Sequence, residues 1–153
     1  MVLPLSMFVF DLVDINFIQN TIAIEGFINS ANSALEIFCL DTGERLREHI
    51  GLGFVFDSDG SVYYIASRPH ISPIESWGNN KIMNENGEVL FESEPLVVIR
   101  TELTIDGDML SFYTDDIRKW SELWGSEGPP ARASAEGETL SGDPITHHTI
   151  RIR

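Results

Sequence analysis

Apolar and polar residues alternate in short runs over the first 114 positions of the chain. The pattern is clearest over residues 21–28, 54–56, 61–65, 101–105 and 109–113. Because successive side chains of a β-strand point to opposite faces, a period of two predicts strands with one buried face. The chain is therefore expected to be mostly β.

Acidic turn signals stand between these runs, at residues 41–43, 57–60, 84–87 and 106–108, and each contains a glycine that follows Asp, Asn or Thr. Asn, Asp and Gly tolerate the positive φ of tight hairpin turns. Three hairpins are predicted, joining 54–56 to 61–65, 81–83 to 88–91 and 101–105 to 109–113. The expected architecture is an antiparallel meander that forms a small barrel or a two-layer sandwich, with the barrel preferred.

Two earlier segments are harder to assign. Residues 1–10 are apolar, with no basic residue ahead of them and acidic residues at 11 and 14, so they fit a first strand better than a secretory signal. The segment 34–40 is expected to be a strand. Residues 44–49 fit either a strand or a short helix.

One helix is predicted over about 115–124, packed on the sheet. Thr114 is expected to cap it, Asp115 and Asp116 suit the positive end of the helix dipole, and Gly125 stands where a helix ends. Its tryptophans, Trp120 and Trp124, suit packing across the sheet. If the sheet and helix enclose a ligand pocket, these two side chains and Trp77 are its expected lining residues.

The chain after this helix divides into two parts. Residues 125–143 are rich in Gly, Pro, Ala, Ser and Glu without apolar periodicity, which predicts a mobile loop, either disordered or serving as a lid. A final strand is predicted over about 145–152. The whole chain, residues 1–153, is expected to form a single β-rich domain.

The charge of the chain is strongly negative, with 24 acidic and 10 basic residues and a formal net charge of −14. Such a field repels nucleic acid and attracts cationic partners, so a broad nucleic-acid surface is not expected. Two explanations of the acids are open: they provide solubility and protect sheet edges, or they recognise a basic protein. No apolar stretch approaches the ~20 residues of a membrane span.

The sequence contains no residue pattern that predicts a cofactor or a metal site. The single cysteine, Cys39, cannot form an internal disulfide, and its apolar surroundings predict a buried thiol in a cytoplasmic protein. His147 and His148 are adjacent in a predicted strand and point to opposite faces, so no metal site is predicted. No cofactor is expected, and the oligomeric state is left open.

Two extended segments place candidate site residues on common faces. The final strand sends His148, Ile150 and Ile152 to one face, and a second set to the other: His147, Thr149 and Arg151. An extended segment over 64–72 likewise places four residues on one side: Tyr64, Arg68, His70 and Ser72.

The pair of motifs formed by His70 with Ser72 and by His147 with Thr149 resembles the two His-x-Ser/Thr motifs of the 2H phosphoesterases. Members of that family cleave cyclic or 2′-linked phosphodiesters without a metal. The resemblance implies that His70 and His147 act as base and acid, in an order left open, while the two hydroxyls hold the phosphate. Arg68 and Arg151 would add charge complementarity. The alternative is that the two histidines lie on the surface of different strands.

Three functions are therefore expected as alternatives. The first is an acidic binding protein, such as an inhibitor or immunity-type factor, that recognises a basic protein. The second is the metal-independent phosphodiesterase that the resemblance implies. The third is a β-barrel that binds a small apolar ligand or catalyses a cyclase-like reaction, with Tyr64, Trp77, Trp120 and Trp124 as lining residues. Whether the protein is an enzyme is left open.

Overall fold

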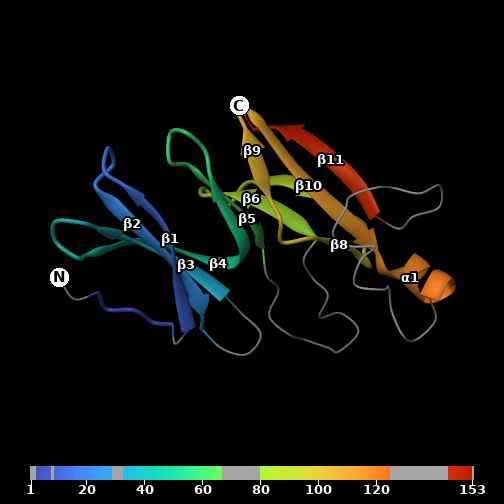
Figure 1. Cartoon of the computed structure of the whole chain (residues 1–153), viewed down its shortest axis with the longest axis horizontal. Coiled ribbons are helices and arrows are strands. Elements are labelled where there is room, and N and C mark those ends of the chain that lie inside the picture. The colour runs from blue at the N-terminus through green and yellow to red at the C-terminus, as the bar shows by residue number, and fades with distance from the viewer. Residues whose placement is uncertain (1–2, 8, 29–32, 67–79, 125–144, 153) are drawn as a thin grey trace.

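The computed structural model describes residues 3–7, 9–28, 33–66, 80–124 and 145–152, and these residues are mostly β. Seven consecutive strands form one antiparallel meander in the order β1 to β7, curled into a half-barrel (Figure 1). The strands are β1 (Val9–Asn16), β2 (Thr21–Phe27), β3 (Ser33–Cys39), β4 (Arg45–Phe56), β5 (Val62–Ala66), β6 (Lys81–Asn84) and β7 (Val89–Glu92).

A second, smaller sheet follows the half-barrel in the chain. It contains β8 (Val97–Ile99), β9 (Thr104–Asp106), β10 (Met109–Asp116) and β11 (Ile145–Arg151). Its order is β11-β10-β8, and β9 also pairs with β10. The mostly β class predicted from the alternation is confirmed, and it takes the form of a curled open sheet with a separate small sheet.

All three predicted hairpins are present, as β4–β5, β6–β7 and β9–β10. In two of their turns, a side-chain oxygen accepts hydrogen bonds from backbone N–H groups. Asp57 Oδ1 accepts the N–H groups of Asp59 and Ser61 at 2.9 and 3.0 Å, and Asn84 Oδ1 accepts two N–H groups at 3.0 Å in the same way. The turn glycines have positive φ, as the sequence predicted: Gly43 (70°), Gly60 (80°), Gly87 (79°) and Gly107 (61°).

The strand β4 resolves the ambiguity over residues 44–49, which are strand from Arg45 onward and not helix. Residues 45–50 pair with β3, whereas residues 51–56 pair with β5 across a bulge. Gly53 lies at this bulge with φ of 60°, and a Cβ there would come within 2.5 Å of the Thr101 carbonyl oxygen. Glycine therefore lets β4 pass close to the segment that leads into β9.

Apolar side chains bury both faces of β5. One face packs against the small sheet and the other points into the half-barrel. The first cluster contains Tyr63, Ile65, Ile82, Ile99, Leu103, Leu110 and Phe112. The second contains Ala23, Leu35, Ile37, Phe54, Val62 and Tyr64.

The predicted first strand over residues 1–10 was wrong in its position. Residues 3–7 are irregular, and the strand begins at Val9 and continues through the two acidic positions to Asn16. Residues 3–7 instead cover the outer face of β2 and β3, where Met7 is buried. The carboxylate of Glu36 on β3 is fully buried there and accepts hydrogen bonds from Ser6 N and Oγ at 3.2 and 2.7 Å. The apolar side chains of this segment pack against β2 and β3, although their sequence pattern predicted a strand.

The predicted helix is shorter than expected and is not capped by Thr114. That residue lies within β10, because residues 114–116 pair with β8, and its hydroxyl lies 2.8 Å from His148 Nε2. The helical segment α1 (Ile117–Trp124) spans eight residues, and Asp116 caps it by accepting the Arg118 N–H at 3.1 Å. It lies beside β8 at the end of the small sheet (Figure 1). No helix in the described part of the chain is long and apolar enough to cross a membrane.

Candidate functional site

The final strand presents its predicted residues as the alternation required. His147, Thr149 and Arg151 of β11 are exposed, whereas His148 is half-buried. The His147 ring packs 4.9 Å from the Tyr113 ring, and the Thr149 hydroxyl lies 3.3 Å from Ser111 Oγ. Arg151 is exposed, and its Nε is paired with Asp108 Oδ2 at 3.0 Å.

The other predicted site residues are not brought to β11 by the described structure. Tyr64 is buried inside the half-barrel, while the small sheet packs on the opposite face of β5. Trp120 and Trp124 belong to α1, but their side chains are outside the description. Four further residues lie outside the described ranges: Arg68, His70, Ser72 and Trp77. The convergence of His70 with His147 stays a prediction, as does the loop over 125–143.

A small hollow, lined by both polar and apolar side chains, opens on the inner face of the half-barrel. It is bounded by the turn between β1 and β2, the turn between β4 and β5, and the middle of β4. Its volume admits about one water molecule. The lining residues are Asp14, Asn16, Gln19, Thr21, Ala23, Ile37, Arg47, Phe56 and Gly60.

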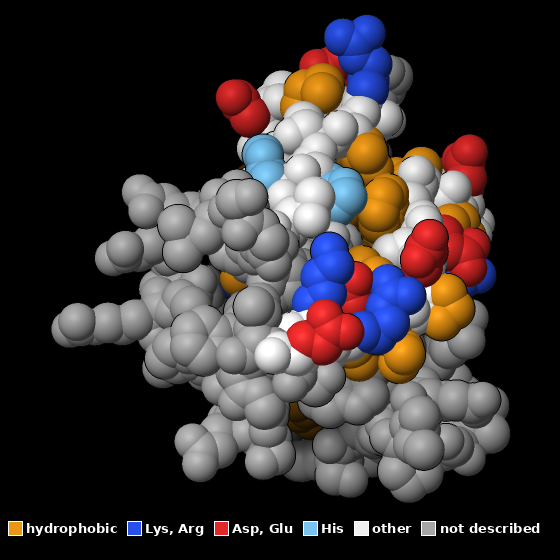
Figure 2. All heavy atoms as spheres, turned by 90° about the vertical axis from the view of Figure 1, so that its right-hand side faces the viewer, with side chains coloured by type: hydrophobic (Ala, Val, Ile, Leu, Met, Phe, Trp, Pro, Cys, Tyr) orange, Lys and Arg blue, Asp and Glu red, His pale blue; other side chains and the backbone are white. Residues whose placement is uncertain are grey.

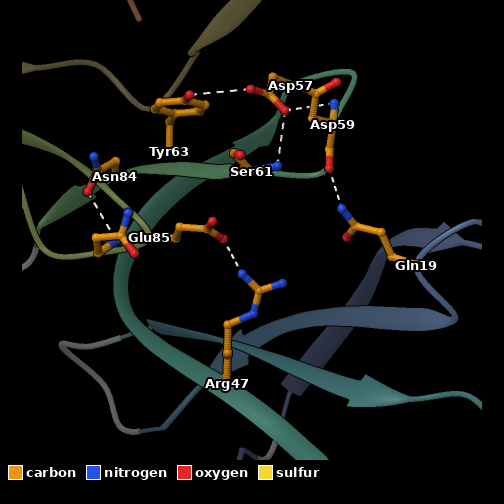
Figure 3. A network of polar contacts seen from close by, with 9 residues as sticks. Gln19, Arg47, Asp57, Asp59, Ser61, Tyr63, Asn84 and Glu85 are labelled. Carbon is orange, nitrogen blue, oxygen red and sulfur yellow. Dashed lines mark hydrogen bonds and ion pairs between the residues drawn. The ribbon is translucent and has the colours of Figure 1, made fainter. Parts of the chain in front are cut away.

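Long-range polar contacts surround this hollow. Figure 3 shows Arg47 of β4 reaching to Glu85 in the turn between β6 and β7, and Gln19 reaching to the carbonyl oxygen of Asp59. Above them, Asp57 Oδ2 accepts a hydrogen bond from the Tyr63 hydroxyl at 3.3 Å (Figure 3). The Arg47 contact ties β4 to the turn between β6 and β7, and the Gln19 contact ties the turn between β1 and β2 to the turn between β4 and β5.

Two titratable rings lie deeper on the same inner face. The His49 and Tyr64 rings are 5.2 Å apart, and Tyr64 also stacks on Phe54 at 5.5 Å. Burial lowers the pKa of His49, as does the nearby Arg47 guanidinium, whereas Glu85 acts in the opposite direction. Burial raises the pKa of Tyr64. Both shifts favour the neutral form of the ring.

The half-buried His148 has a similar environment in the small sheet. Its ring stacks on Phe112 and lies beside Phe91, with both centroid distances 5.1 Å. Burial, and secondarily the neighbouring His147, lower its pKa. Among the residues that the structure describes, no group of three or more His, Cys, Asp or Glu side chains is arranged to hold a metal ion.

Basic side chains in the described chain are almost all neutralised internally. Figure 2, seen from the side of α1 and β11, shows acidic and basic side chains interspersed, and the ion pairs explain this mixture. Six of the seven described Lys and Arg side chains have carboxylate partners: Arg45, Arg47, Lys81, Arg100, Arg118 and Arg151. Most cations of the described residues therefore lie beside a carboxylate, and the whole sequence holds 24 acidic residues against 10 basic ones.

The cysteine is placed differently from the prediction. Cys39 lies at the end of β3 and is partly exposed. Hydrogen bonding from Thr42, first through its side chain, lowers the pKa of the thiol. The apolar run that suggested burial ends one residue later in a turn, which brings the sulfur to the surface.

No family model, curated protein or solved structure matches this chain significantly. The functional interpretation consequently rests on its own residues.

Proposed function

We propose that this chain is an acidic β-rich binding protein that recognises a basic partner protein in the cytoplasm, as an inhibitor or immunity-type factor does. The observation that carries the proposal is the internal pairing of its cations. Because six of the seven described basic side chains already contact carboxylates, the remaining acids confer a negative field that an external cationic surface can neutralise.

The exposed acids available for this role are spread over several turns and α1. Five of them have no ion pair with a cation within the described structure: Asp41, Glu44, Glu88, Asp106 and Glu122. Asp41 lies in the turn between β3 and β4, and the other four follow that turn in the chain. Electrostatic recognition of this kind increases the association rate and weakens as salt screens the charges.

Affinity capture from the native host at low and high salt tests the proposal. The tagged chain is expected to retain a basic protein at about 0.05 M NaCl and to release it at about 0.5 M, because the Debye length shortens. A variant carrying Glu44→Gln, Glu88→Gln, Asp106→Asn and Glu122→Gln should bind that protein at least about tenfold more weakly. A matched variant, with Thr101→Ser, Thr104→Ser and Thr146→Ser, should bind it normally. Equal binding by the neutralised variant would reject the proposal.

A metal-independent phosphodiesterase is the second candidate. It is supported by the common exposed face of His147 and Thr149 on β11, which the His-x-Thr motif requires. The test is hydrolysis of 2′,3′-cyclic nucleotides and 2′–5′ oligonucleotides in the presence of EDTA. Activity should be lost in both His70→Gln and His147→Gln, and retained in His148→Gln, whose ring points to the other face. Activity that survives either of the first two substitutions would exclude paired acid–base action.

A further inference from the structure

The turn between β1 and β2 exposes two large apolar side chains in succession. Phe17 is 82% exposed and Ile18 is 99% exposed, whereas the other exposed large apolar side chains lie between 39% and 50%. A single exposed apolar residue is ordinary, but adjacent ones at a projecting turn are typical of an interaction site. Figure 1 shows this turn at the end of the β1–β2 hairpin, on the side of the molecule away from β11 and α1.

The turn is held in place by contacts with two neighbouring turns. Gln19 donates its N–H to Asn16 Oδ1 at 3.0 Å, and its side-chain amide donates to the Asp59 carbonyl oxygen. Asn20 has φ of 57°, and its carbonyl oxygen accepts the Leu40 N–H at 2.9 Å. The two apolar side chains are therefore presented on a fixed backbone, which lowers the entropy cost of binding.

Acidic residues occur in the two turns that contact this apolar tip. The turns that hold it carry the exposed Asp41 and Asp59, and Asp14 lines the adjoining hollow. The basic side chain of that hollow, Arg47, is already paired with Glu85. An apolar tip with a negative rim complements a pocket with a positive rim, and it is repelled by anionic lipid headgroups.

We propose that Phe17 and Ile18 insert into an apolar pocket, rimmed by Lys or Arg, on the basic partner protein. This inference rests on the proposed function and adds the contact that would anchor the complex. Buried apolar and aromatic anchors contribute most of the binding energy in protein interfaces, and surrounding charges mainly govern encounter and specificity.

Photo-crosslinking locates the contact. The full chain carrying Phe17→benzoylphenylalanine is irradiated with the partner recovered in the salt-dependent capture, and the crosslinked peptide of the partner is sequenced. A crosslink to an apolar pocket flanked by Lys or Arg is the expected result. A crosslink outside such a pocket, or none in a complex that has formed, overturns the inference.

Affinity measurements with purified partner supply the second readout. Phe17→Ser and Ile18→Ser should each raise Kd about 30-fold or more, as truncation of an interface anchor does. Val89→Ser, at a 43% exposed position on β7, is the matched apolar control and should leave Kd unchanged. The pair Asp41→Asn with Asp59→Asn should slow association about tenfold at low salt.

The outcomes separate this inference from the broader proposal. If Phe17→Ser binds normally while the four-carboxylate variant does not, the tip is not the anchor but electrostatic recognition stands. If both bind normally, both are wrong. Flotation with phosphatidylcholine vesicles, with and without phosphatidylglycerol, tests the lipid alternative, and vesicle binding that Phe17→Ser abolishes would also overturn the inference.

Discussion

His49 is a neutral imidazole enclosed by the half-barrel. It is 8% exposed, and its Nε2 has no hydrogen-bond partner among the described residues. A buried polar atom left unpaired costs on the order of 1–3 kcal/mol of stability. Because the folded protein lowers the pKa of this ring, the unfolded chain binds its proton more readily than the native state does.

The lowered pKa of His49 makes the stability of the protein depend on pH. The free energy of unfolding should be highest above the ordinary histidine pKa and should decrease as pH falls through it, since protonation favours the unfolded chain. His148, whose pKa is also lowered, acts in the same direction. His49→Phe should therefore reduce the loss of stability between about pH 7.5 and 5.5, as measured by urea unfolding.

The same series contains its control. Thr146 is exposed on β11 and carries no titratable group, and Thr146→Ser should leave the pH dependence of unfolding unchanged. An unaltered pH slope in His49→Phe would show that other groups account for the acid sensitivity.

At the residue level, the sequence predicted which side chains of β11 share a face, whereas their role as a site stays a prediction. The alternation of β11 correctly separated the exposed His147 and Thr149 from the half-buried His148. The burial of His49 and the pairing of Arg47 with Glu85 could not be predicted, because both depend on how the sheet curls and on partners far apart in sequence. The exposure of Phe17 and Ile18 has a signal in the sequence, because two large apolar residues stand between predicted strands.

At the level of elements, β4 connects the two parts of the large sheet, and its glycines permit the close contacts. A Cβ on Gly51 would meet the Ile65 carbonyl oxygen at 2.4 Å, and one on Gly53 would meet Thr101 at 2.5 Å. The Ile65 oxygen belongs to β5, and the Thr101 oxygen belongs to the segment between β8 and β9. Neither oxygen can move without disturbing that part of the backbone.

Gly53→Ala should thus destabilise the protein by more than the cost of its positive φ alone. Gly107 has nearly the same φ, 61° against 60°, but no atom lies within 4 Å of an added Cβ. Gly107→Ala should cost about 1 kcal/mol, and Gly53→Ala about 2 kcal/mol more, measured as free energies of unfolding. Equal losses in the two variants would show that the Thr101 contact relaxes without cost.

Strands and turns were predicted correctly where their signals lie within a few neighbouring residues. Turn residues and alternation located the hairpins, because both act within a few positions of the chain. The helix start was misplaced because Thr114 and Asp115 satisfy capping rules and also suit the strand pairing that prevails. The separation into two sheets depends on long-range packing, which no local pattern reports.

For the whole molecule, the excess of acids opposes compaction. A net charge of −14 generates self-repulsion that internal pairs relieve only where a cation is available. Dissolved salt screens exposed charges beyond about 10 Å at 0.1 M.

Raising NaCl from about 0.02 to 0.3 M should accordingly raise the Tm, by an amount that scanning calorimetry can resolve. The variant neutralised at Glu44, Glu88, Asp106 and Glu122 should respond less. A Tm that falls with salt would mean that the ion pairs contribute more than the repulsion.

The strand order also has a consequence for synthesis on the ribosome. Each strand of the half-barrel pairs with its neighbour in the chain, so this sheet can assemble hairpin by hairpin as residues up to Glu92 emerge. The small sheet differs, because β10 acquires β11 as a partner only after 28 intervening residues, 117–144, have been translated. A nascent chain stalled before β11 should thus hold a formed half-barrel beside an unfinished sheet, with the apolar face of β10 open to chaperones.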